Sequence, residues 1–262
     1  MRVIILTESS RGTAAHHLPF LLNCPQIEIV QVVKSKGQKL NRKKHLISKI
    51  KKAIAIGPLG VINGFRMRKW FGENIDRHLN LEDLEQICKR NNIRFAVTDM
   101  TNSQMTMDLF TAANADIGVS LGNGFISKKI FSIPALGMIN IHHEILPEYQ
   151  NAQSIIWQLY NYSSYTGYTI HAVTSKIDGG DIVYQEKLPI IFKKTLSETI
   201  TATSISLLKA SAEGLVRLLQ NYSTFIREAK PQGAATSYTT PSGRQLFRIL
   251  KNFNRLKREN GV

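Results

Sequence analysis

The sequence predicts an α/β protein with a Rossmann-like, mostly parallel open sheet. The first observation is an apolar run at residues 2–6 that leads through a small-residue loop into a helical pattern at 14–22. The second is that short apolar runs continue to alternate with helical patterns along the chain. The third is a hydrophobic content of 43% in 262 residues, which is enough for a sizeable core. One large α/β domain is therefore expected.

The expected elements follow the chain in order. Apolar runs predict strands at 2–6, 27–33, 93–97, 116–121, 138–141 and 168–173. Helical periodicity predicts helices at 14–22, 81–90, 103–113, 153–159, 196–219 and 244–257. Residues 34–80 form a basic helical insert that exceeds the spacing of a compact βαβ unit. We expect the main domain at 1–230, followed at 231–262 by a linker and a basic helix as a short C-terminal extension.

The loop after the first strand contains Ser9, Ser10, Arg11 and Gly12. A strand, a small-residue loop and a helix present backbone N–H groups and the positive end of a helix dipole to a phosphate. The loop therefore predicts contact with a phosphate-bearing substrate. The other interpretation is an ordinary connection in which Ser or Thr caps the helix.

The stretch at 137–181 brings an amide, an imidazole and a carboxylate to strand ends and turns. Asn140 interrupts the strand at 138–141, and His142 follows that strand. Asp178 opens an Asp-Gly-Gly-Asp turn. Because open α/β sheets build their sites at the carboxyl ends of strands, these three side chains are candidate functional groups. Each one alone has an ordinary alternative, as a strand-end cap, a core histidine or a turn residue.

The ordered motifs of this stretch resemble those of the formyltransferases that use 10-formyltetrahydrofolate, a family that includes glycinamide ribonucleotide, methionyl-tRNA and sugar N-formyltransferases. The motifs are Asn140-Ile141-His142, Leu146-Pro147, Thr169-Ile170-His171 and Ile177-Asp178-Gly179-Gly180-Asp181. The resemblance covers residues 115–189. It implies a sheet of the formyltransferase type, 10-formyltetrahydrofolate as the co-substrate, and Asn140, His142 and Asp178 as the catalytic trio.

Formyl transfer to an amine requires an oxyanion stabiliser and a group that moves a proton from the amine to the departing folate nitrogen. Asn140 offers an amide N–H to the oxyanion. His142, two residues further on, projects to the same side of the strand and can donate to the oxyanion or pass the proton. Asp178 can orient and charge-stabilise His142, or relay protons through water. The mechanism needs no side-chain nucleophile and no metal. His171 either supports this group from behind or is a core residue.

A glycine segment after the strand at 116–121 is the expected donor site. Leu121, Gly122, Gly124 and Ile126 match the pterin-binding segment of the family, which implies contact with the folate. Asn123 stands where an aromatic residue is common. Glycine lets the backbone approach a flat ring closely. The alternative is a turn that only changes the direction of the chain.

Departures from the family pattern concern the amine substrate. His143-Glu144 and Gln150-Asn151 stand where the family often has Pro-Ser and Arg-Gly. Gln150, and the lack of room for the C-terminal barrel of the methionyl-tRNA enzymes, argue against a tRNA or another nucleic acid. By elimination, the resemblance favours a nucleotide-linked amino sugar destined for surface polysaccharide, contacted by Glu144 and Tyr149. Activity on methionyl-tRNA or glycinamide ribonucleotide is the alternative.

The formal charge of +15 is concentrated in the insert and near the C-terminus. Residues 40–71 combine basic residues with an apolar helical face, a pattern typical of a helix that lies on an anionic membrane. The face consists of Leu46, Ile47, Ile50 and Ile54, followed by an aromatic group with Trp70 and Phe71. The alternative is a helix docked on its own domain with a solvated basic face. A membrane-binding or nucleic-acid-binding protein on a formyltransferase scaffold is the rival to an enzyme.

Two cysteines, Cys24 and Cys88, form neither a disulfide framework nor a metal pattern, which favours a reducing compartment. The apolar run at 3–6 is too short for a signal peptide, and no apolar run is long enough to span a bilayer. We therefore expect a cytoplasmic protein, with at most peripheral contact with the inner face of the membrane. A homodimer is compatible with the sequence, which does not determine the oligomeric state.

Overall fold

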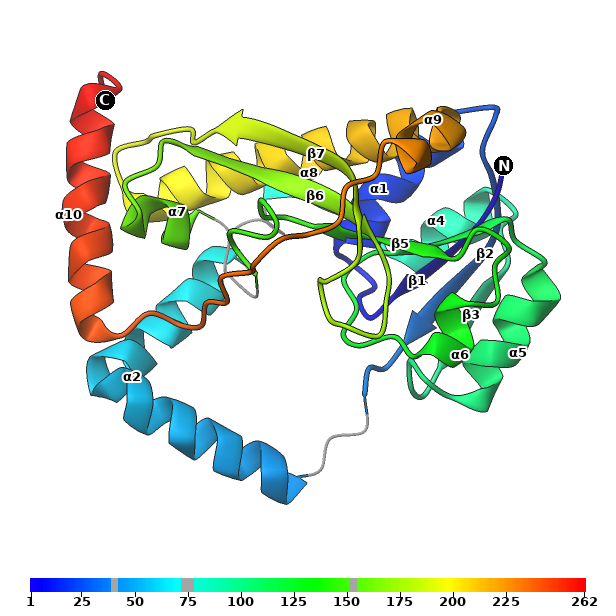
Figure 1. The fold of residues 1–262 in the computed structure, drawn as a ribbon, viewed down its shortest axis with the longest axis horizontal. Coiled ribbons are helices and arrows are strands. Elements are labelled where there is room, and N and C mark those ends of the chain that lie inside the picture. The colour runs from blue at the N-terminus through cyan, green and yellow to red at the C-terminus, as the bar shows by residue number, and fades with distance from the viewer. Residues whose placement is uncertain (39–41, 72–77, 151–154) are drawn as a thin grey trace.

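The computed structural model describes residues 1–38, 42–71, 78–150 and 155–262, with the backbone alone at 42–45 and 68–71. Within these ranges, a seven-stranded sheet has the order β3-β2-β1-β4-β5-β6-β7 (Figure 1). The strands are β1 Arg2–Thr7, β2 Glu28–Ser35, β3 Phe95–Thr98, β4 Ile117–Ser120, β5 Met138–His142, β6 Tyr165–Ala172 and β7 Ile182–Pro189. The helices are α1 Thr13–Leu22, α2 Arg42–Phe71, α4 Leu84–Arg90, α5 Gln104–Ala113, α6 Lys128–Phe131, α7 Ile156–Tyr160, α8 Leu196–Gln220, α9 Tyr222–Arg227 and α10 Gly243–Glu259.

Within the run β3-β2-β1-β4-β5, adjacent strands are parallel to each other. β6 is antiparallel to β5, and β7 is antiparallel to β6. The predicted α/β fold with a mostly parallel open sheet is therefore confirmed. The sequence does not predict β7, because Gln185, Glu186 and Lys187 interrupt its apolar pattern. These residues are tolerated because β7 is an edge strand with a partly exposed surface.

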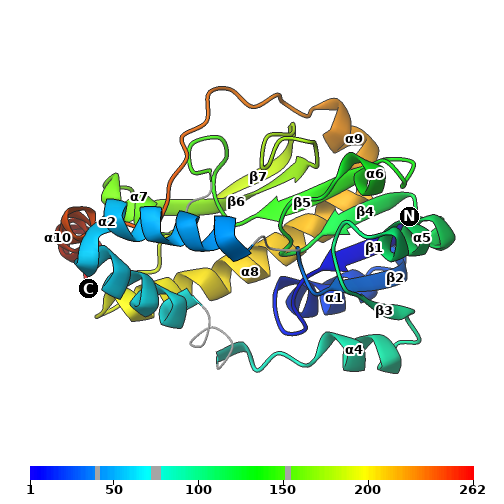
Figure 2. The ribbon, with the colours of Figure 1, turned by 90° about the horizontal axis from the view of Figure 1, so that it is seen from below.

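Helices cover both faces of the sheet, which explains the continuous apolar run in β1. Val3 and Ile5 belong to a core shared with α1, α4 and α8. Ile4 and Leu6 belong to the opposite core, shared with α5 and α6. All four side chains are fully buried, since successive strand residues face opposite sides. Figure 2 shows the two helical layers on either side of the sheet.

The basic insert forms α2, whose two legs meet at Gly57. This residue has φ 71° and ψ 173°, and Pro58 follows, so the helix axis breaks between the legs. The second leg packs on the body through Met67, which is buried in a core cluster with residues of α8 and α10. The first leg extends away from the sheet (Figure 1). Residues 39–41 and 72–77, like the side chains of Trp70 and Phe71, lie outside what the structure describes.

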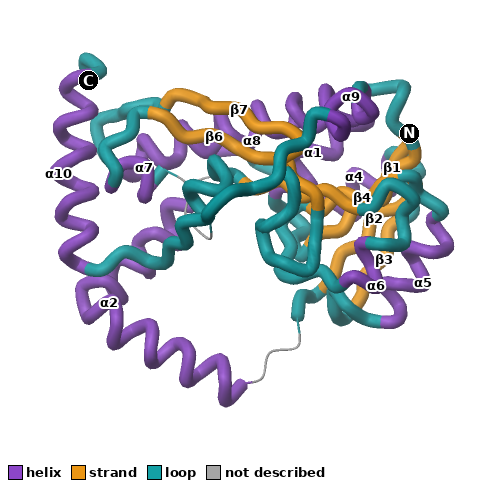
Figure 3. Tube along the Cα trace, in the orientation of Figure 1, coloured by secondary structure: helices purple, strands orange, loops and turns teal. Residues whose placement is uncertain are grey.

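The segment between α9 and α10 crosses the body as a strap (Figure 3). The backbone of Gln150 exchanges hydrogen bonds of 2.9 Å with Thr236 O and Tyr238 N, and Trp157 Nε1 donates to Thr239 O at 3.0 Å. α10 then packs against α7 and α2. The chain beyond residue 230 is thus bound to the main domain, and its separation as a unit stays a prediction. The predicted helix at 153–159 begins outside the described residues.

No helix in the described ranges combines the length and the apolar composition required to cross a membrane.

Candidate active site

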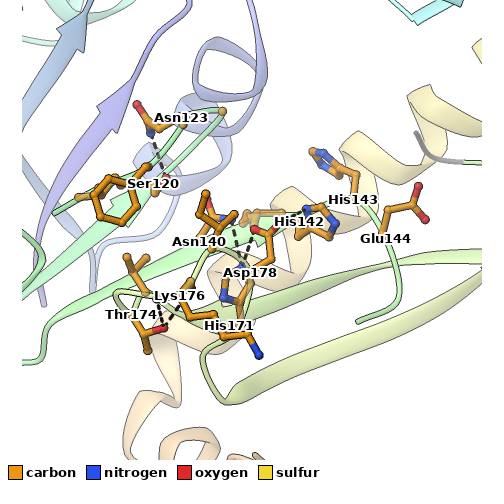
Figure 4. Close-up of a pocket in the computed structure, with 17 residues that line it drawn as sticks. Ser120, Asn123, Asn140, His142, His143, Glu144, His171, Thr174, Lys176 and Asp178 are labelled. Atoms are coloured by element: carbon orange, nitrogen blue, oxygen red, sulfur yellow. Dashed lines mark hydrogen bonds and ion pairs between the residues drawn. The ribbon is translucent and has the colours of Figure 1, made fainter. Parts of the chain in front are cut away.

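A cavity of about 550 Å³ lies at the carboxyl ends of β4 and β5, where the glycine segment and the turn at Asp178 meet. Such a volume is within the range of small-molecule sites. Among the residues that line it are Asn140, His142, His171 and Asp178 (Figure 4). The structure therefore brings the three predicted catalytic side chains together at one wall, although they come from β5 and from the turn before β7.

Asn140 is held by His171 across the β5–β6 pair. The two residues are opposite each other in the antiparallel register, with 3.2 Å between Asn140 Nδ2 and His171 Nε2. His171 Nδ1 lies 3.0 Å from Ala172 O and donates to it, so Nε2 is left to accept from the Asn140 amide. Burial lowers the pKa of His171, in keeping with this neutral tautomer. One N–H of Asn140 is thereby used for orientation, and the other is available to a bound group.

Asp178 lies between two histidines. Its Oδ2 is 4.0 Å from His142 Nδ1, and its Oδ1 is 3.8 Å from His171 Nε2. Both distances exceed those of direct hydrogen bonds. The side chains of His142 and Asp178 are largely buried, with 18% and 15% exposed. His142 Nε2 lies 3.4 Å from Tyr149 O. The ring of His142 thus has an acceptor on each side and faces the cavity with a carboxylate behind it.

The turn that carries Asp178 is fixed from outside the motif. Asp178 has a φ of 49°, and a Cβ on Gly180 would meet Ala172 O at 1.9 Å, so the turn requires glycine at 180. Gln150 Nε2 donates to the carbonyl of Asp178 at 3.3 Å, and Gln232 Nε2 donates to it at 2.9 Å. These two glutamines position the carboxylate, and Gln232 comes from the segment that the sequence predicts as a linker.

The glycine segment forms another part of the cavity wall. Gly122 has a φ of 78°, which glycine adopts without strain, and Gly124 N donates to Glu8 Oε1 at 3.1 Å. Asn123 Nδ2 donates to Leu6 O at 2.6 Å and to Ser120 Oγ at 3.0 Å, so it fastens the turn to β1 and β4. Gly122, Gly124 and Ile126 line the cavity. Leu121 is fully buried in the sheet core behind it.

A family model described as formyl transferase matches residues 1–218, which is most of the chain.

The chain belongs to the formyl transferase family.

Curated relatives include methionyl-tRNA formyltransferases and the bifunctional polymyxin resistance protein ArnA of Wigglesworthia glossinidia brevipalpis, which is 40% identical over 70 residues, 27% of this chain and 11% of the relative. The methionyl-tRNA formyltransferase of Thermotoga maritima is 24% identical over 159 residues, 60% of this chain and 50% of the relative. That of Caldicellulosiruptor saccharolyticus is 31% identical over 129 residues, 49% of this chain and 40% of the relative. The chain spans about half the length of these two methionyl-tRNA formyltransferases or less.

Solved structures show the same fold at low identity. WlaRD, described as a sugar 3N-formyl transferase in the presence of dTDP and 5-N-formyl-THF, has a TM-score of 0.55 at 17% identity, covering 97% of this chain and 79% of that one. An N-formyltransferase from Helicobacter canadensis has a TM-score of 0.55 at 15% identity, and the alignment covers 96% of this chain and 80% of that one. A glycinamide ribonucleotide transformylase from Symbiobacterium toebii has a TM-score of 0.53 at 14% identity, and the alignment covers 83% of this chain and 84% of that one. The formyl transferase fold is thus shared with enzymes of different amine substrates.

The predicted phosphate loop of this formyl transferase lies outside the lining of the main cavity. Gly12 precedes α1 without a side-chain cap, so the first N–H groups of the helix have no cap from that residue. Lys34 Nζ, from the end of β2, donates to Ser10 Oγ. Ser9 and Arg11 are exposed. The loop therefore combines an uncapped helix start with two basic side chains, of which the sequence motif indicates only Arg11.

Of the two predicted amine contacts, Glu144 lines the main cavity, whereas Tyr149 lies outside its lining. Glu144 is 1% exposed, Gln158 Nε2 donates to its Oε2, and its carboxylate points away from Asn140 and Asp178 (Figure 4). Burial raises the pKa of Glu144 well above its ordinary value. Tyr149 lines a second hollow of about 320 Å³ and stacks on Tyr238 at 5.6 Å between ring centroids. Both contacts stay predictions.

His143 is half-buried at the main cavity and joins a cluster with His17 and Ser211 that the sequence motifs do not reveal. Ser211 Oγ lies 3.1 Å from His143 Nε2 and 3.0 Å from His17 Nε2, which links α1, α8 and the loop after β5. Burial, followed by the charges of His142 and His16, lowers the pKa of His143 to about 4. His143 is therefore neutral near pH 7 and supports the chain next to His142. The sequence signal for this cluster was His17, which lies on the buried face of α1.

Among the described residues, no group of three or more His, Cys, Asp or Glu side chains is placed to hold a metal ion.

Proposed function

We propose that the chain transfers the formyl group of 10-formyltetrahydrofolate to the primary amine of a small substrate. The observation that carries this proposal is the convergence of Asn140, His142 and Asp178 on one wall of a cavity of about 550 Å³. An amide donor, an imidazole and a carboxylate are the groups that acyl transfer to an amine requires. The family membership and the folate-like ligands named for WlaRD and the Helicobacter canadensis enzyme support the choice of donor.

In the proposed reaction, the neutral amine attacks the formyl carbon, a C–N bond forms, and the formyl oxygen becomes an oxyanion. The free N–H of Asn140 donates to that oxygen, because its other N–H is engaged by His171. The bond from the formyl carbon to the folate nitrogen then breaks. His142 carries the proton released by the amine to that nitrogen, and Asp178 stabilises the transient imidazolium. The donor ring is expected against Gly122, Gly124 and Ile126.

For the amine, we propose a nucleotide-linked amino sugar, which in a cell would serve surface polysaccharide. The name of the Helicobacter canadensis structure includes dTDP-3-aminofucose, and this structure and WlaRD align with nearly the whole chain. Arg11, Lys34 and the start of α1 supply positive charge for a diphosphate. Methionyl-tRNA is the second candidate, since it is the substrate in the names of curated relatives. The free Cys24 and Cys88 thiols suit a cytoplasmic location.

A mass-spectrometric screen tests the function. The purified chain is incubated with 10-formyltetrahydrofolate and a panel of nucleotide amino sugars, glycinamide ribonucleotide and methionyl-tRNA. A product heavier by one formyl group, absent with His142→Ala, supports the proposal. Formylation of methionyl-tRNA but of no sugar would overturn the proposal of an amino-sugar substrate. Absence of folate binding in calorimetry would overturn the proposal of an enzyme and favour a binding protein on this scaffold.

A further inference from the structure

The first leg of α2 exposes a row of large apolar side chains. Leu46 is 59% exposed, Ile47 53%, Ile50 51% and Ile54 77%. Their spacing of one, four and eight residues from Leu46 places them on one face of the helix. Side chains of this size are normally covered, so a contiguous row of them marks an interaction surface.

The same helix carries strong positive charge. Residues 42–71 contain nine Lys and Arg and no Asp or Glu. Lys49, Lys51 and Lys52 are exposed on the first leg, beside the apolar row. A second copy of this helix would place like charges opposite each other in a two-fold interface. Nucleic acid would pair with the lysines but would leave the isoleucines in water.

α10 continues this surface at the kink of α2. Gly243, at the start of α10, lies against the side chain of Leu59, which is 66% exposed. From there Phe247, 73% exposed, projects from the helix with Arg244 and Lys251 one turn before and after it. The opposite face of α10, with Ile249 and Phe253, is buried on the body. α10 is in contact with α2, and Figure 2 shows the two helices meeting at one end of the molecule.

We propose that the first leg of α2, together with the first turns of α10, binds the surface of an anionic lipid bilayer. An amphipathic helix of this kind lies in the interface plane, where its apolar row enters the acyl boundary and its lysines meet anionic headgroups. An anionic bilayer would cover the apolar side chains and pair the basic side chains with headgroups at the same time. Gln38, four residues before α2 in the sequence, donates to Phe125 O of the glycine segment, and Phe125 lines the cavity.

Vesicle co-sedimentation of the full chain tests the proposal. The wild type is mixed with vesicles of phosphatidylcholine and phosphatidylglycerol, or of phosphatidylcholine alone, at low and high salt. We expect sedimentation with the anionic vesicles only, weakened by salt because headgroup attraction is screened. Charge reversal in Lys49→Glu/Lys51→Glu/Lys52→Glu should raise the lipid concentration for half-binding by about tenfold or more. Ile50→Ser/Ile54→Ser should weaken binding similarly while keeping the charge.

A matched control separates the surface from net charge. Lys89→Glu/Lys187→Glu/Lys209→Glu changes the same number of charges on α4, β7 and α8, where the lysines are also exposed. This control should bind vesicles as the wild type does, and circular dichroism should show all variants folded. Equal weakening by both triple variants would overturn the proposal. So would a wild type that stays in the supernatant, a dimer by light scattering that Ile50→Ser/Ile54→Ser dissociates, or complete displacement from vesicles by a short RNA.

Discussion

Asn140→Ala should affect both catalysis and stability, because the two N–H groups of the Asn140 amide have different tasks. One lies 3.2 Å from His171 Nε2, in a histidine that is 3% exposed. The substitution leaves that buried acceptor without its donor, which should lower the free energy of unfolding by about 1–3 kcal/mol. Loss of the other N–H removes an oxyanion donor and should lower kcat by about 10²–10³-fold.

The double variant Asn140→Ala/His171→Leu separates the two effects. With both partners gone, no buried acceptor is left unpaired, so the loss in unfolding free energy should be smaller than the sum of the two single losses. The kcat of the double variant should stay at or below that of Asn140→Ala. Urea denaturation and single-turnover formylation measure the two quantities. An Asn140→Ala enzyme with a kcat within about threefold of the wild type would refute the oxyanion role.

Three further predictions follow from the site. His142→Ala and Asp178→Asn should each lower turnover by about two to four orders of magnitude with unchanged circular dichroism; near-normal turnover of His142→Ala would contradict the assignment. Gly124→Val should raise the KM for the donor more than the KM for the amine. The fold can accept the substitution, because a Cβ at this position would have ordinary contacts, the nearest at 3.6 Å from Glu8 Oε1. Equal rises in both KM values would show that the segment is only a structural turn. Glu144→Gln should change the pH dependence of stability. Burial raises the pKa of Glu144 in the folded state, so its contribution is present below the unfolded pKa and is lost as pH rises towards the folded one. Thermal melts from acidic to neutral pH should therefore show a gain for Glu144→Gln that grows with pH, and a constant difference would show that Glu144 is charged in the fold.

The local signals in the sequence were sufficient for six of the seven described strands and for the central motif. Residues 2–6 read as a buried strand because helices cover both sides of β1, and such strands need apolar residues at every position. Asn140 and His142 share a strand, so their common side follows from strand geometry alone. The turn motif made Asp178 a candidate, and the family resemblance grouped it with His142, from which it lies 36 residues away in the sequence but 4.0 Å away in the structure.

Only the tertiary structure determined what holds these groups in place. Gln150 and Gln232 both reach the carbonyl of Asp178, yet they are separated from it by 28 and 54 residues. Ser211 of α8 joins His17 to His143, and Gln158 of α7 donates to the buried carboxylate of Glu144. Local propensity carries no information about such pairs, because each depends on where packing brings a distant element. The sequence by itself determined the fold class and the motif, and long-range packing decided the positions and the protonation states of the side chains around them.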